Sequence, residues 1–200
     1  MTTGDIASKV GAAILDFLGD VPKSTTAPSV VPQQAARGVA NAAAAKAAVA
    51  AGSLALPVGP IGWLTILPEL VAVWRIQARM VADIAALYDK KASLTREHML
   101  YCLFKHSAAQ AVRDLVARVG ERLLVRSTSL AVLQSIARAI GVEMTQRAIT
   151  KGLARWVPIA GAVGVGAYAY YDTARVAMTA MELFAQDIVV EPEQREMARP

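Results

Sequence analysis

The stretch AGSLALPVGPIGWLTILPELVAVW, residues 51–74, is the most informative part of the chain. No charged side chain lies between Ala47 and Pro68, and three prolines and three glycines fall in this run. A transmembrane helix needs about 20 apolar residues that can hold one helix. Pro57, Pro60 and Pro68 are expected to break this run into pieces, because proline removes a backbone donor and disfavours helix just before it. The run therefore predicts a buried turn between two core helices, or a segment that meets a membrane.

The composition describes one apolar domain. The chain has 200 residues, of which 55% are hydrophobic and 18% charged, against a typical charged share of about 25%. That length suits a single domain that can bury a large core. The one cysteine, Cys102, excludes an internal disulfide framework and fits a reducing compartment. The N-terminus lacks a basic start followed by an unbroken apolar core, so we expect no signal peptide and a cytoplasmic location, at most peripheral on the inner face of the membrane.

The first third of the chain divides at a linker. Residues 4–19 predict an amphipathic helix, because apolar side chains recur at three- and four-residue spacing. A proline- and serine-rich linker follows, and we expect it to let this helix move independently or wrap around the rest. The predicted divisions are an N-terminal helix (1–20), the linker (21–34), a helical domain (35–188) and a disordered polar tail (189–200).

The helical domain begins with an alanine-rich helix over residues 35–54 and a long helix from Pro68, in its first position, to Asp89. Thr95 can cap the next helix, which we expect to continue through AVRDLVARVGERLLV (111–125). Gly141 is expected to end or break the element that follows. We take the apolar turn to consist of Pro57, Gly59, Pro60, Gly62 and Pro68.

No segment of the sequence shows convincing strand alternation. We therefore predict an all-α fold, a compact bundle of about six to eight helices with the apolar turn and a small-residue helix at its centre.

The small-residue helix carries Gly161, Gly164 and Gly166. Residues 164–169 match a loose form of the dinucleotide fingerprint, but that fingerprint works only between a strand and a helix of a parallel sheet. We interpret the three glycines as positions of close helix packing. A leucine at Gly164 is then expected to overpack the contact and cost about 1–3 kcal/mol.

His98, Cys102 and His106 follow at four-residue spacing and so lie near one face of a helix. Adjacent pairs could share a metal ion or form a thiol–imidazole dyad. The two histidines are about 12 Å apart along such a helix, however, and no further ligand is identifiable. We expect no metal, no cofactor and no catalytic residues.

Positive charge is concentrated in the middle of the chain. Residues 110–156 hold eight basic and three acidic side chains, whereas residues 157–200 hold three and six. Arg118, Arg122 and Arg126 step by four, and we expect them along one helix face as contacts to acidic lipid headgroups. The alternative is an ordinary solvated face. No nucleic-acid partner is expected, because no recognised motif or set of stacking aromatics accompanies the charge.

Two regions resemble the EcsC protein family, over roughly residues 40–185. The first is the Gly/Pro-rich turn and the long helix after it, where the matching residues are Gly59, Pro60, Gly62, Ile84, Ala85 and Tyr88. Asp89 stands where the family has a glycine. The second lies near the C-terminus, with matches at Lys151, Pro158, Gly161, Gly164, Asp172, Ala177 and Phe184. The resemblance implies a bacterial, all-helical, often membrane-associated protein with no established enzyme activity.

Together these observations predict a non-enzymatic helical protein that associates with membranes or binds a lipid or another apolar ligand. One alternative is an adaptor that docks a membrane protein or self-associates. Another is a pore-forming bacterial effector whose hydrophobic hairpin is sheltered until it meets a bilayer. In each case we expect no permanent membrane span, because prolines interrupt the longest charge-free run.

Overall fold

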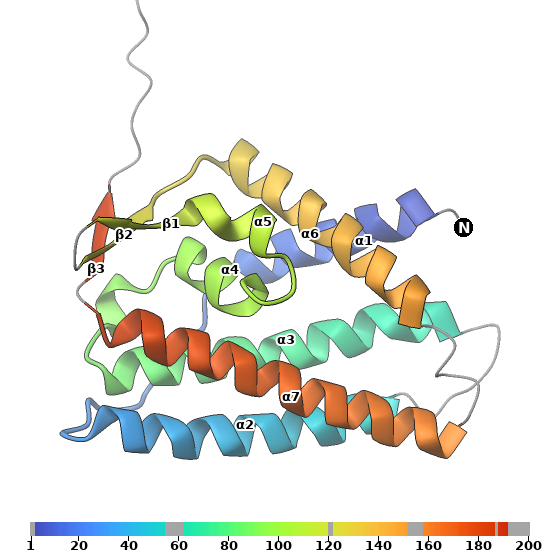
Figure 1. Cartoon of the computed structure of the whole chain (residues 1–200), viewed down its shortest axis with the longest axis horizontal. Helices are drawn as coiled ribbons and strands as arrows, with labels where there is room; N and C mark the ends of the chain where they lie inside the picture. The colour runs from blue at the N-terminus through green and yellow to red at the C-terminus, as the bar shows by residue number, and fades with distance from the viewer. Residues whose placement is uncertain (1–2, 55–61, 120–121, 152–157, 187, 192–200) are drawn as a thin grey trace, which may run out of the picture.

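The computed structural model describes residues 3–54, 62–119, 122–151, 158–186 and 188–191. In these residues the helices are α1 (Thr3–Leu18), α2 (Pro32–Leu54), α3 (Gly62–Leu87), α4 (Arg96–Phe104), α5 (Ala109–Val112), α6 (Leu130–Lys151) and α7 (Pro158–Phe184). Short 3-10 turns cover Lys91–Ser93 and Arg113–Leu115, and the strands are β1 (Val116–Val119), β2 (Arg122–Arg126) and β3 (Ile188–Glu191). Helices dominate, so the predicted all-α bundle is confirmed (Figure 1).

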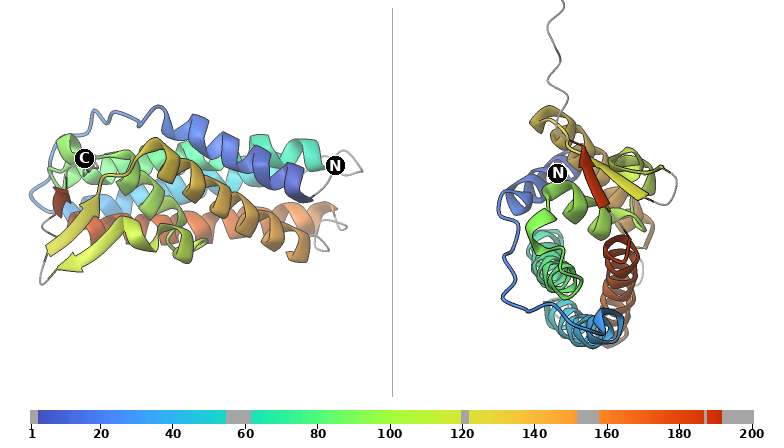
Figure 2. Two further views of the ribbon diagram at one scale, coloured as in Figure 1. Left: turned by 90° about the horizontal axis from the view of Figure 1, so that it is seen from above. Right: turned by 90° about the vertical axis from the view of Figure 1, so that its left-hand side faces the viewer.

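The helices form two groups. The long helices α2, α3 and α7 pack against one another, and α1 pairs with α6 on the other side of the molecule (Figures 1 and 2). The short helix α4 lies between the groups and contacts α3, α7 and α1. The small sheet lies at the end of the bundle where α7 finishes. The two groups thus meet around α4.

One hydrophobic core runs through both groups. It joins Ile14 of α1, Trp74 of α3, Phe104 of α4 and Phe184 of α7, all of them buried. The Trp74 ring meets the Phe104 ring edge-on, with centroids 5.5 Å apart. Full burial of one large apolar side chain contributes about 1.5–3 kcal/mol. The N-terminal helix is therefore part of the core.

The linker after α1 runs along α3. The hydroxyls of Ser24 and Thr26 both donate to Oδ1 of Asp83, and the Arg79 guanidinium donates to the carbonyl of Lys23 at 3.1 Å. The linker therefore lies against α3, and the first helix packs into the core through Val10, Ile14 and Leu18. The linker is also shorter than expected, since α2 begins at Pro32, two residues before the predicted linker ends.

The start of α3 differs from the prediction, and its C-terminal cap explains the conformation of Asp89. The helix begins at Gly62 and continues through Pro68, which we had expected in the first helical position. At the C-terminus, Asp89 has a φ of 59°, and the N–H groups of Asp89 and Lys90 donate to the carbonyls of Ala86 and Ala85. These two bonds are those of a Schellman cap, in which a left-handed residue follows the helix. Such a position favours glycine, and here it holds Asp89.

The segment after α4 corrects the predicted helix. The chain leaves α4 at Phe104, and β1 and β2 pair antiparallel, with Val116 opposite Val125 and Val119 opposite Arg122. In β2 the side chains of Leu123 and Val125 are buried while that of Arg126 is exposed. This alternation is that of a strand covering a core on one face. We missed it because each strand has only four or five residues.

The third strand comes from the C-terminus. β3 pairs in parallel with β2, with Leu123 opposite Ile188, so the sheet order is β1-β2-β3. Residues 189–191, which the prediction places in the disordered tail, belong to this strand. Residues 192–200 lie outside the described part.

Two glycines allow close helix contacts that a side chain would prevent. A Cβ at Gly141 of α6 would run into the carbonyl oxygen of Ala7 in α1 and lie 3.0 Å from the nitrogen of Gly11. The prediction that Gly141 ends or breaks a helix is wrong, because α6 continues through it. A glycine stands at this position because the contact with α1 leaves no room for a side chain. In the other group, a Cβ at Gly166 of α7 would lie 2.9 Å from the carbonyl oxygen of Ala48 in α2.

Candidate functional site

The outer side of α7 carries large side chains that the core does not cover. Tyr168, Tyr171 and Met178 are 49%, 59% and 45% exposed. Together with Arg175 they follow one another at spacings of three and four residues, which puts them on one side of the helix. The Arg175 guanidinium lies over the Tyr171 ring, 5.8 Å from its centroid. We define the α7 face as the exposed side chains of Tyr168, Tyr171, Arg175 and Met178; Val163 and Tyr170 are also exposed but lie further round the helix.

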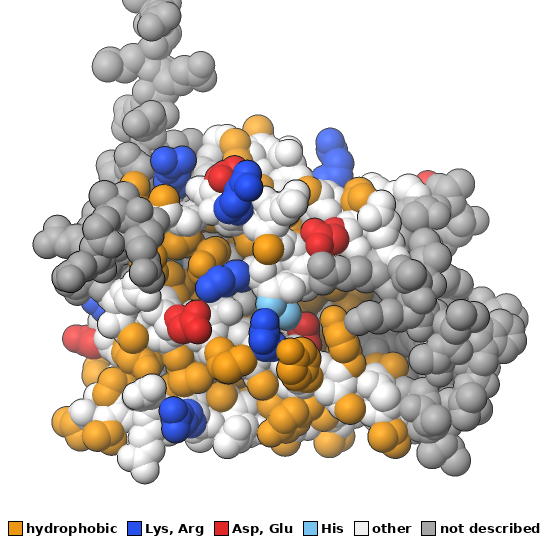
Figure 3. All heavy atoms as spheres, viewed as in Figure 1, with side chains coloured by type: hydrophobic (Ala, Val, Ile, Leu, Met, Phe, Trp, Pro, Cys, Tyr) orange, Lys and Arg blue, Asp and Glu red, His pale blue; other side chains and the backbone are white. Residues whose placement is uncertain are grey.

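The neighbouring helix α2 supplies no negative charge. No residue from Pro32 to Leu54 is acidic, and its exposed charged side chains are Arg37 and Lys46. In the space-filling view, hydrophobic side chains spread over the part of the surface formed by α7 and α2, with basic side chains among them (Figure 3). The α7 face therefore adjoins a neutral to basic surface.

The inner side of α7 is fixed by a polar network. Gln77 of α3 donates through Nε2 to Oδ2 of Asp172 at 2.8 Å and to Oγ1 of Thr173 at 3.2 Å. Oδ1 of the same Asp172 lies 2.7 Å from Nε2 of His106, which follows α4. Gln77 and Thr173 are buried, so these bonds are shielded from water. The network sets the rotation of α7 and hence which side chains face outward.

The histidines and the cysteine of the predicted helix face do not meet in one site. His98 is fully buried and stacks on Phe184, whereas His106 pairs with Asp172. Cys102 is fully buried, and this burial raises the pKa of its thiol more than the nearby Lys105 lowers it. A neutral, inaccessible thiol is a poor nucleophile. Among the described residues, no group of three or more His, Cys, Asp or Glu side chains is placed to share a metal ion.

The three arginines proposed as lipid contacts do not share a helix face, which corrects the prediction. Arg118 lies in β1, opposite Leu123, while Arg122 and Arg126 lie in β2. The helical step of four residues that would have aligned the three side chains is therefore absent. Arg126 is exposed at the end of β2.

The three glycines of α7 divide between packing and solvent. Gly166 is buried against Ala48, as predicted for close packing. Gly164 is exposed, and a Cβ there would meet no atom within 4 Å, so the packing prediction is wrong at this position. It failed because Gly164 lies on the outer side of α7, two residues and about 200° from Gly166. Gly161 belongs to α7, in a stretch whose side-chain surroundings are not described.

Most of the predicted apolar turn lies outside the described residues. Pro57, Gly59 and Pro60 fall in the gap at 55–61. Gly62 and Pro68 belong to α3, where Pro68 is exposed.

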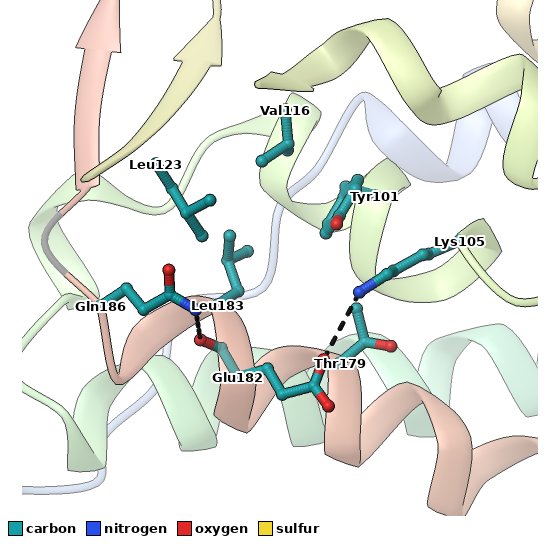
Figure 4. A pocket seen from close by; sticks show the side chains of 8 residues that line it. All are labelled: Tyr101, Lys105, Val116, Leu123, Thr179, Glu182, Leu183 and Gln186. Carbon is teal, nitrogen blue, oxygen red and sulfur yellow. Dashed lines mark hydrogen bonds and ion pairs between the residues drawn. The ribbon is translucent and has the colours of Figure 1, made fainter. Parts of the chain in front are cut away.

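A small niche lies between α4, α7 and the β1–β2 hairpin (Figure 4). It has a volume of about 180 Å³, and Lys105 and Glu182 form an ion pair across it at 3.4 Å. Partial burial acts against the charge on Lys105, but Tyr101 and Glu182 outweigh it and raise the pKa of the ammonium group. Because the charges in the niche already satisfy each other, it is a weaker candidate site than the α7 face.

No helix among the described residues combines the length and the apolar character that crossing a bilayer requires. Comparison with known proteins gives no match, whether with family models, curated sequences or solved structures. The resemblance to the EcsC family therefore stays a prediction, and the α7 face carries the functional argument.

Sequence reasoning missed the α7 face. Its signal was present, because Tyr168, Tyr171 and Met178 are large side chains at three- and four-residue spacings in a helix rich in alanine and glycine. Spacing along α7 does not indicate which side of the helix the core covers. That choice depends on Gln77 and His106, which lie 95 and 66 residues from Asp172 along the chain.

Proposed function

We propose that the protein is a non-enzymatic, peripheral membrane-binding protein that attaches to acidic lipid surfaces through the α7 face. The observation that carries the proposal is the exposed row of Tyr168, Tyr171 and Met178 with Arg175 among them. The family resemblance points to the same kind of function.

Tyrosine suits the proposed location. Its ring is apolar and its hydroxyl is polar, so it partitions into the headgroup layer at the boundary of a membrane. Met178 can enter the adjoining acyl layer, as the apolar side of an interfacial helix does. Such attachment needs no spanning helix.

Charge favours an acidic surface over a neutral one. The chain has a net charge of +5, and each Lys or Arg held near an acidic membrane contributes about 1 kcal/mol. Arg175 lies within the α7 face, and Arg37 and Lys46 are exposed on α2. On α7 the carboxylates are Asp172, paired with His106, and Glu182, paired with Lys105. Lys105 offsets the charge of Glu182, and the Asp172 carboxylate is engaged by Gln77 and His106 on the inner side of α7.

The direct test is flotation with vesicles. Wild type should bind mixed phosphatidylglycerol–phosphatidylcholine vesicles and bind phosphatidylcholine alone much less. The double variant Tyr171→Ser, Met178→Ser removes apolar area worth more than 1.4 kcal/mol at about 25 cal/mol per Å², so binding should fall about tenfold or more. Arg175→Gln should weaken binding about fivefold, and chiefly at low salt.

A matched control uses exposed apolar side chains elsewhere. Leu130 and Val132 of α6 are 62% and 45% exposed, and the variant Leu130→Ser, Val132→Ser should bind vesicles as wild type does. A third variant, with Arg118, Arg122 and Arg126 changed to glutamine, tests the hairpin. Equal loss in the α6 and α7 variants, or loss in the hairpin variant alone, would overturn attachment through the α7 face. Self-association without vesicle binding would favour the adaptor alternative.

A further inference from the structure

His98 occupies an unusual position at the start of α4. The helix begins after Thr95, its N-cap residue, and His98 is the third residue of its first turn. Its side chain is fully buried, and its ring stacks on Phe184, the last residue of α7, at 6.0 Å and 24°. The imidazole thus joins the first turn of one helix to the last turn of another.

The hydrogen bonds determine where the proton of the neutral ring lies. The backbone N–H of Thr95 donates to Nδ1 of His98 at 3.2 Å, so Nδ1 must be an acceptor. The Thr95 hydroxyl is 2.9 Å from the same nitrogen. The proton therefore lies on Nε2, which is buried and has no hydrogen-bond partner among the described residues. This arrangement is a capping box in which histidine takes the place of the usual Glu or Gln.

A second proton would break this arrangement. The protonated ring offers no acceptor, so the backbone N–H of Thr95 would lose its partner. The ring would also carry a charge inside an apolar contact. Burial is the main reason that the pKa of His98 is lowered to about 4, and Glu97 acts weakly in the opposite direction.

The surroundings provide little to hold a histidinium. The elements that contact α4 include α3, α7, α5, α1 and β2. Among the described residues, the charge that acts on His98 comes from Glu97, whose Oε1 already accepts from the N–H and hydroxyl of Thr128. α7 contributes the uncharged Phe184, and Cys102, one turn further along α4, is a neutral thiol.

We propose that His98 is an acid-sensitive latch: its protonation releases the start of α4 from the end of α7 and exposes the apolar side chains between them. The buried residues that would be uncovered include Leu100, Leu183 and Phe184. This device is independent of the proposed membrane attachment, because it is internal to the bundle and acts without vesicles.

The sign of the pH effect follows from the two states. Unfolded or opened chains take up a proton near the ordinary histidine pKa of 6.5, whereas the closed protein does so only near 4. Stability from the neutral ring is therefore complete above pH 6.5 and is lost as the pH falls towards 4. The opening equilibrium constant should rise about tenfold for each pH unit in that window.

The test compares wild type with His98→Gln. Glutamine keeps the capping-box acceptor at this position but cannot be protonated. Urea unfolding and binding of an apolar dye are measured from pH 7 to pH 4 without lipid. Wild type should lose stability and gain dye binding more steeply than His98→Gln, by up to about 100-fold in the unfolding constant at pH 4.5. His106→Gln, which removes the other histidine, should keep the steep wild-type response.

Equal pH dependence in wild type and His98→Gln would overturn the latch. If His98→Gln does not fold at pH 7, NMR titration of the wild-type ring replaces it. A His98 ring that takes up its proton near pH 6.5 while the core stays closed would overturn the proposal equally.

Discussion

Two helix crossings in the described residues place a glycine against a backbone carbonyl, with different partners. Between α1 and α6, glycines from both helices meet, Gly11 and Gly141. Between α2 and α7, Gly166 meets Ala48 in an alanine-rich helix. In both crossings a backbone carbonyl occupies the space where a Cβ would lie. Close approach therefore depends on the position of one glycine and not on how many a helix contains.

The two crossings also show that a cluster of glycines predicts close packing less well than its frequency suggests. α7 displays its glycines in the cluster GAVGVG, and the cluster suggested packing at all three. α6 carries the isolated Gly141, which suggested a helix end. The structure gives the isolated glycine the tighter contact and leaves Gly164 of the cluster open to solvent.

The largest effect is expected at the α1–α6 crossing. In Gly141→Ala the new methyl group would meet the carbonyl of Ala7 and the backbone of Gly11. The free energy of unfolding should fall by about 3 kcal/mol, because backbone on both sides must shift. This loss exceeds the gain of up to about 1 kcal/mol that alanine brings in helix propensity. Urea unfolding of wild type and variant measures it, and an unchanged midpoint would show that the crossing is looser than described.

A smaller effect is expected at the α2–α7 crossing. A Cβ in Gly166→Ala would lie 2.9 Å from the Ala48 carbonyl oxygen, a less severe overlap than at Gly141. We expect the free energy of unfolding to fall by about 1–2 kcal/mol. Thermal unfolding monitored by circular dichroism checks this. If Gly166→Ala proved more damaging than Gly141→Ala, the proposed order of the two crossings would be reversed.

The smallest effect is expected at Gly164, the matched control on the same helix. The sequence predicted a cost of about 1–3 kcal/mol for Gly164→Leu. Since that position is open, we now expect a change within about 0.5 kcal/mol, or a modest gain from helix propensity. The same thermal assay applies. A marked loss of stability in Gly164→Leu would show that Gly164 also packs against a neighbour, as Gly166 does.

The sequence pattern predicted the helices and caps whose signals lie within a few neighbouring residues. The amphipathic spacing of α1, the alanine run of α2 and the cap at Thr95 are all found where expected, within a few residues. The hairpin was missed because its arginines also fit a four-residue helical step. Its strands are stabilised by the pairing of β2 with β3, whose sequence lies about 65 residues later.

The candidate site was harder to predict for the same reason. The exposed side of α7 is set by Asp172, which binds groups from α3 and from the segment after α4. The left-handed backbone of Asp89 is a contrasting case, because the local cap of α3 accounts for it. Its left-handed conformation closes the cap of α3 at the position where the resembling family has glycine. The departure at Asp89 is thus compatible with the backbone that a glycine would adopt.

The pairing of α2 with α7 has a consequence for how the chain is made. About 100 residues separate the end of α2 at Leu54 from the start of α7 at Pro158. At roughly 5–20 residues per second, a ribosome needs about 5–20 seconds to supply α7, which completes with α3 the cover of α2. The part of α2 that stays open during that interval exposes mainly methyl groups, because the buried row of α2 is alanine: Ala36, Ala40, Ala44, Ala47 and Ala51. A helix that must wait for its partner thus offers neighbouring nascent chains little apolar area to bind.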